Sequence, residues 1–133
     1  MNFKQFCKNL EDKISSAYND GVTLEVAEKL AGEFLHAQIV VSNQLKTSDL
    51  DSRMRKSGLK AVRAAVYMAT CSIADKKPTE TMLENILNTN ELVQKEQDSL
   101  DTAEVERDDL KRYYDIFREG HIYFRGIAKG KFD

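Results

Sequence analysis

Apolar residues recur at alternating steps of three and four along the last third of the chain, and this spacing constrains the fold most strongly. A helix with 3.6 residues per turn places residues so spaced on one continuous stripe. The stripe comprises Val93, Glu96, Leu100, Ala103, Arg107, Leu110, Tyr114, Phe117, His121, Phe124 and Ala128. Its two charged interruptions, Glu96 and Arg107, are of the kind that fixes the register or the oligomeric state of a coiled coil. We therefore expect a long C-terminal helix with a heptad-like seam, which Asn90 caps at its start.

The remaining sequence is also typical of helices. The chain of 133 residues has a single proline, and no segment alternates with period 2 for long enough to predict a strand. A first helical stripe ends at Asp20-Gly21, and Thr23 is the expected N-cap of the next helix. We expect an all-α fold whose helical hairpins assemble into an oligomer. One domain over residues 1–133 would then contain N-terminal helices over 1–47, a basic helix over 48–74 and, over 79–131, an acidic helix that runs into a basic, aromatic assembly segment.

Two boundaries in the middle of the chain allow alternatives. Thr47, Ser48 and Asp49 offer a break or a new cap, although one helix could also run straight through them. The segment Asp75-Lys76-Lys77-Pro78 predicts a loop, because proline lacks a backbone donor. After it, either Thr79 or Thr81 caps a short helix, and Thr81 with Glu84 has the spacing of a capping box.

The net charge of −2 conceals a strong segregation of sign. Residues 53–74 contain five basic side chains and no acidic one, residues 80–109 carry a balance of −8, and residues 111–131 carry a balance of +4. A surface that contacts only solvent usually carries positive and negative side chains interspersed. These blocks of one sign therefore indicate a binding partner.

The basic helix presents its charges as a stripe. Arg53, Lys56, Lys60 and Arg63 fall within an arc of about 80° on a helical wheel, and Tyr67 follows on the same face. A phosphate backbone would neutralise such cations, and an aromatic ring next to them would stack on a base. The predicted nucleic-acid-binding residues are Arg53, Arg55, Lys56, Lys60, Arg63 and Tyr67. The alternative is internal pairing of the stripe with Glu96, Asp101 or Glu104 of the acidic helix.

The C-terminal segment mixes aromatic and basic side chains, which suits either an interface or nucleic acid. We expect its seam to lie on an arm that does not fold back completely, and so to join subunits. The predicted oligomerisation residues are Leu110, Tyr114, Phe117, His121, Phe124 and Arg125. Either an interface or a nucleic-acid contact would suit the basic residues Arg125, Lys129 and Lys131.

No pattern typical of catalysis is present, so we expect neither an enzyme nor a bound metal or cofactor. The chain has no glycine-rich phosphate loop, and Glu33-x-x-His36 is half of a di-iron ligand set whose other half is missing. Glu104 and Asp108 lie one turn apart, as in a nucleotide pyrophosphohydrolase, but their charged neighbours favour a solvated face. Cys7 and Cys71 lack metal-ligand spacing, and no apolar run has the length of a signal peptide or membrane span.

Residues 50–131 resemble the UvsY-type recombination mediators of tailed phages. The resemblance rests on a basic helix ending near Tyr67, on Lys76-Lys77-Pro78-Thr79, on the stretch from Leu92-Val93 to Leu100, and on Phe124-Arg125-Gly126-Ile127-Ala128-Lys129. It implies an oligomer in the cytoplasm of a bacterial host that binds single-stranded DNA and helps a phage recombinase displace the single-strand binding protein. The N-terminal helix with Phe3 and Phe6 departs from that family. The alternative is a structural or adaptor protein of a phage that binds other proteins through a coiled-coil arm.

Overall fold

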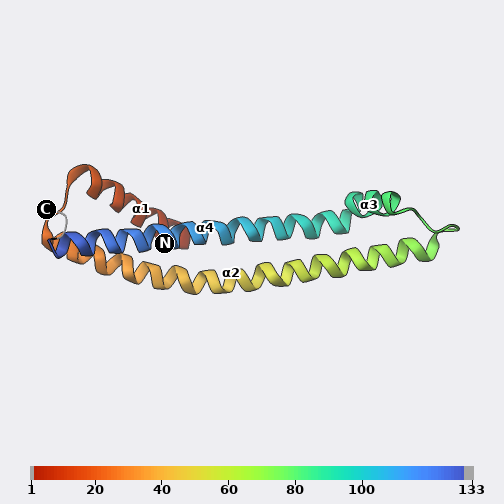
Figure 1. Ribbon diagram of the computed structural model, residues 1–133, viewed down its shortest axis with the longest axis horizontal. Coiled ribbons are helices and arrows are strands. Elements are labelled where there is room, and N and C mark those ends of the chain that lie inside the picture. Colours follow the sequence, from red (N-terminus) through yellow and green to blue (C-terminus); the bar gives the residue numbers. More distant parts are fainter. Residues whose placement is uncertain (1, 131–133) are drawn as a thin grey trace. The chain divides into compact units, whose positions relative to one another are not determined.

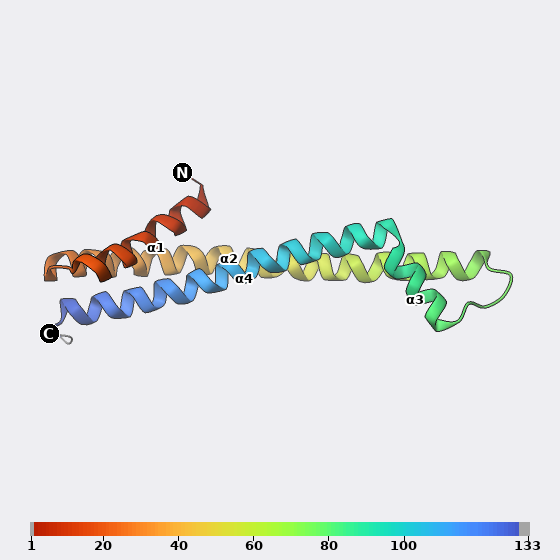
Figure 2. The same cartoon turned by 90° about the horizontal axis from the view of Figure 1, so that it is seen from above.

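The protein is all-α, as the sequence predicts. The computed structural model describes residues 2–130, which form four helices and no strand. The helices are α1 (Phe3–Asp20), α2 (Leu24–Ile73), α3 (Glu80–Thr89) and α4 (Glu91–Ala128), shown in Figures 1 and 2. None of these helices has a stretch apolar and long enough to cross a membrane.

Two compact units divide the chain, and each is described by itself. The first unit contains the described residues up to Lys46 and from Asp108 onward, so α1 packs there with the beginning of α2 and the end of α4. The second unit runs from Thr47 to Arg107 and contains the end of α2, α3 and the beginning of α4.

Side chains and glycines cap the helices largely where the sequence predicts. The Thr23 hydroxyl accepts a hydrogen bond from the Val26 N–H at 3.2 Å, and Asn90 Oδ1 accepts one from the Leu92 N–H at 2.9 Å. Gly21 ends α1 with a φ of 78°, which suits a residue without a β-carbon. Thr79 caps α3, whereas Thr81 lies inside that helix. The capping box of Thr81 with Glu84 is therefore wrong.

Helix α2 passes through the predicted break at Thr47, Ser48 and Asp49 without interruption. A helix boundary between residues 47 and 48 is thus wrong, and the alternative of a continuous helix is confirmed. The two compact units nevertheless divide next to this position, between Lys46 and Thr47. The three polar residues lower helix propensity by only a few tenths of a kcal/mol each. A real break would leave backbone donors and acceptors unpaired at two new helix ends, which costs more.

The core of the first unit is built around aromatic rings. Phe34 of α2 lies 5.8 Å from Phe117 and 5.6 Å from Phe124 of α4, measured between ring centroids, and all three are fully buried. Gly120 makes this packing possible, because a β-carbon there would lie 3.3 Å from Phe34 Cγ. Helix α1 contributes Cys7 and Leu10 to the same buried cluster.

The heptad-like seam of α4 faces the interior of single units, so the prediction that it lies on an exposed arm is wrong. Phe117 and Phe124 are inaccessible to solvent, and Leu110 and Tyr114 are half-buried against the same core. His121 Nδ1 lies 2.9 Å from the Ala31 carbonyl oxygen, to which it donates in the matching tautomer. Among the predicted oligomerisation residues only Arg125 is exposed. The physical reason is that α2 supplies an apolar partner face, so the seam needs no second chain.

The second unit has a smaller, aliphatic core. Leu59, Leu87, Val93 and Leu100 form it, with Val62 and Val66 packed at its edge. The two polar interruptions of the seam contact α2: Arg107 lies 3.9 Å from Asp49, and a β-carbon on Gly58 would lie 3.6 Å from Glu96 Oε2. Both contacts join α4 to α2 within the second unit, so they would be lost if α4 were shifted along α2.

Candidate nucleic-acid interface

The basic stripe lies on the second unit, on the part of α2 that follows Asp49. Arg53, Lys56 and Lys60 are exposed, and none of them forms an ion pair within residues 2–130. At a rise of about 1.5 Å per residue, Arg53 and Lys60 lie about 10 Å apart along the helix axis. Like charges this close repel one another, and no acid of residues 2–130 lies within ion-pair distance of them.

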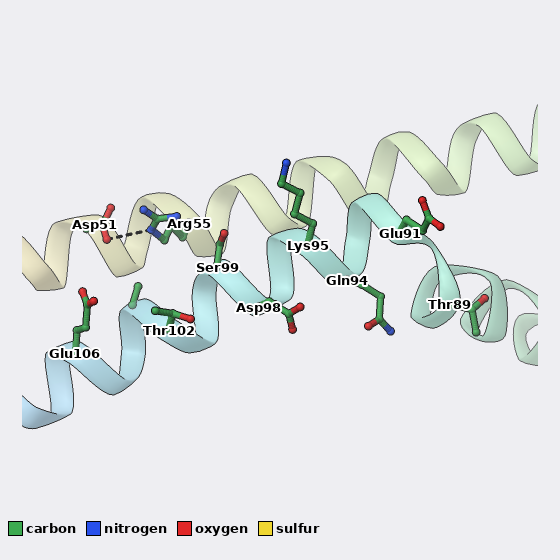
Figure 3. Close-up of a pocket in the computed structure, with 11 residues that line it drawn as sticks. Asp51, Arg55, Thr89, Glu91, Gln94, Lys95, Asp98, Ser99, Thr102 and Glu106 are labelled. Atoms are coloured by element: carbon green, nitrogen blue, oxygen red, sulfur yellow. Dashed lines mark hydrogen bonds and ion pairs between the residues drawn. The ribbon is translucent and has the colours of Figure 1, made fainter.

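Two of the predicted cations have partners within the second unit. Arg63 is half-buried, and its Nη2 lies 3.6 Å from Glu84 Oε2 of α3. Arg55 points from another face of α2, where its Nε lies 3.0 Å from Asp51 Oδ2, one turn earlier (Figure 3). The stripe that faces solvent without a charge partner is therefore Arg53, Lys56 and Lys60, which we call the free stripe.

The alternative, internal pairing of the stripe with the acidic helix, is not observed for Glu96, Asp101 and Glu104 within residues 2–130. Glu96 lies over Gly58, and the Asp101 carboxylate accepts a hydrogen bond from Gln97 at 2.9 Å. Glu104 has no ion pair to the stripe. The acid that does reach the stripe is Glu84 on α3, which sequence spacing did not single out.

Tyr67 follows the free stripe by about two turns. Its side chain is 43% exposed, which leaves part of the ring accessible to a ligand. At the other end of the chain, Arg125 and Lys129 are exposed on the first unit, whereas Lys131 lies outside the described residues.

A polar groove opens on the opposite side of α2 from the free stripe. It has a volume of about 710 Å³. It lies between the middle of α2, the last residue of α3 and the beginning of α4 (Figure 3). Asp51, Glu91, Asp98 and Glu106 line it together with Arg55 and Lys95. These opposite charges make it unlike a phosphate site, and the described residues contain no cluster of three or more candidate metal ligands.

In the half motif Glu33-x-x-His36, the glutamate forms an ion pair that joins two helices. Glu33 Oε2 lies 2.8 Å from Lys13 Nζ of α1, and His36 is exposed on the next turn of α2. The carboxylate thus joins two helices of the first unit.

Comparisons with known proteins do not assign this chain to a family. Neither a scan against protein-family profiles, nor a search of curated proteins, nor a search of solved structures finds a match. The geometry of the free stripe therefore carries the functional argument.

Proposed function

We propose that this protein binds single-stranded DNA through the free stripe and serves as a recombination accessory protein. One observation carries the proposal: three cations stand exposed on consecutive turns of one helix, and within residues 2–130 no acid pairs with them. Placing them together without counter-charges costs free energy in the absence of a ligand. A chain of phosphates removes that cost and releases its own condensed counterions.

Arg63 and Tyr67 would extend the contact along α2. The Arg63 ion pair with Glu84 is partly exposed and spans 3.6 Å, so it contributes about 0 to 1 kcal/mol, and a phosphate can replace the carboxylate. Tyr67 offers a ring on which an unstacked base can lie, a contact available in single strands but not inside a duplex.

The more specific role, helping a phage recombinase displace the single-strand binding protein, follows from the resemblance to UvsY-type mediators. The rival function is an adaptor that binds proteins through the α4 seam. Phe117 and Phe124 are buried inside the first unit, so that seam offers an adaptor no surface. The free stripe keeps its exposed position, and the observation favours DNA binding.

A salt titration tests the proposal. The affinity for a fluorescent oligothymidine should fall with salt at a log–log slope of about −2 when the free stripe alone contacts phosphates, and of about −3 when Arg63 also does, because each neutralised phosphate of a single strand contributes about −0.7. Arg53→Gln with Lys60→Gln should reduce the steepness of the slope by about 1.4 and leave the helix content unchanged. Anisotropy across a salt series measures both values.

Lys4→Gln with Lys8→Gln is the matched control, because both lysines are exposed on α1 of the first unit. This control should keep the wild-type slope. Negligible binding at low salt, or equal losses in the two double variants, would contradict the proposal.

A further inference from the structure

The outer face of α2 in the second unit carries an apolar stripe that no described helix covers. Its members recur at alternating steps of four and three, and we call them the outer stripe: Leu50, Met54, Ser57, Ala61, Ala64, Met68 and Cys71. The large members are well exposed, Leu50 to 60%, Met54 to 65% and Met68 to 67%. In Figure 1, α3 and α4 both lie above this part of α2, and its lower side is bare.

The outer stripe is distinct from the core face of the same helix. Leu59, Val62 and Val66 point toward α3 and α4, on the side of α2 opposite Ala61 and Met68. Alternating steps of three and four are the spacing by which two helices pack along a coiled-coil seam. Three exposed large side chains on such a seam indicate a partner helix.

We infer that this partner is a second copy of α2, packed antiparallel. From Leu50 to Met68, the stripe has large residues at its two ends and small ones near its centre, a distribution that is complementary to its own reverse. Cys71 lies beyond the paired layers. Antiparallel pairing places Leu50 against Met68 of the partner subunit, and Met54 against Ala64 of the partner subunit. At the centre, Ser57 meets Ala61 of the partner subunit, so the two backbones approach closely. Because the two copies are related by a twofold axis, each of these residue pairs occurs twice in the dimer, as an isologous interface requires.

The charged border of the outer stripe agrees with this arrangement in one place and opposes it in another. Arg53 lies beside Tyr67 of the partner subunit, where a guanidinium and an aromatic face attract each other. Lys60 lies beside Lys60 of the partner subunit, where two ammonium groups repel. The pairing also joins the free stripes of both copies into one band of cations on a single side of the dimer.

This band couples dimer formation to the proposed DNA binding, on which this part of the inference rests. The outer stripe is only about 33 Å long at about 1.5 Å per residue, and one helix pair buries less than the roughly 800 Å² per partner of a standard interface. The free dimer is therefore weak. A phosphate chain along the band neutralises both lysines at position 60, so DNA and the second copy favour each other's binding by linkage.

Light scattering over a range of protein concentrations tests the pairing. Without DNA, added salt should strengthen dimer formation, because it screens the repulsion between the two lysines. With oligothymidine, lower salt should strengthen it. Ala61→Gln should weaken the dimer at least tenfold, because a longer side chain separates the helices at the central layers. Ala69→Gln is the matched control, since Ala69 is exposed on α2 outside the outer stripe.

Disulfide trapping tests the register. In a Cys71→Ser background, a mixture of Ser57→Cys and Ala61→Cys chains should form mixed disulfide dimers faster than either variant alone. Faster linkage of like with like would mean parallel pairing and would overturn the register. A monomer at all concentrations, with DNA affinity lowered by Ala61→Gln, would overturn the inference and assign the outer stripe to base contacts. A dimer that binds no DNA would leave the pairing intact and refute only the proposed function.

Discussion

The two units differ in the side chains that form their cores, which are aromatic in the first unit and aliphatic in the second. The first unit buries three phenylalanine rings and pairs the polar groups beside them, as when Gln38 Nε2 donates to the Tyr114 hydroxyl at 3.2 Å. The second unit buries only a few aliphatic side chains and leaves the Ser52 hydroxyl, 3% exposed, without a hydrogen-bond partner. It also carries the free stripe and the outer stripe. The larger buried core thus lies in the first unit, and the two exposed stripes for which we propose partners lie in the second.

The largest expected effect concerns the aromatic core. Phe117→Ala should lower the free energy of unfolding by about 3 to 5 kcal/mol, because truncating a buried phenylalanine removes its contacts and leaves a cavity. Urea unfolding measures this loss. Native-state hydrogen exchange should show slower exchange around Phe34 than around Leu59, because fewer buried apolar contacts hold the second unit. Equal protection in the two units would contradict the comparison.

A smaller effect of opposite sign is expected in the second unit. Ser52→Ala should raise the free energy of unfolding by about 1 kcal/mol, because a buried hydroxyl without a partner costs about that much and alanine is the better helix former. Thermal unfolding of the variant measures the gain. Ser15→Ala, at an exposed position of α1, supplies the control for helix propensity. Destabilisation by Ser52→Ala would mean that the hydroxyl has a partner, such as a bound water.

The sequence predicts the local features of this fold better than its packing partners. The caps at Thr23 and Asn90 and the seam from Val93 to Ala128 are readable because each depends on residues close in the chain. The sequence cannot show which surface covers the seam, because an apolar face of α2 in the same chain and a helix of a second chain would bury its side chains equally well. For this reason Phe117 and Phe124 were expected at an interface and lie in a core instead.

The candidate site divides in the same way. Spacing places Arg53, Lys56 and Lys60 on one face, and their exposure agrees with that prediction. Arg55 was predicted to bind nucleic acid, although its i,i+4 spacing from Asp51 is a signal from which their ion pair could have been predicted. The contact between Arg63 and Glu84 joins two helices across a loop, so its distance depends on how α3 packs.

A pH-dependent effect on stability is expected from Cys7 in the core of the first unit. Cys7 lies in the first core, and burial raises its pKa from 9.0 to about 11, an effect that the nearby Arg112 opposes. The folded state then holds the thiol proton more tightly than the unfolded state, so this contribution to stability is complete below pH 9 and is lost as the pH rises toward 11. The urea midpoint of wild type should therefore fall more between pH 8 and pH 10.5 than that of Cys7→Ala, which cannot titrate there. Identical pH dependence of wild type and Cys7→Ala would show that the thiol is not held in its neutral form by the aromatic core.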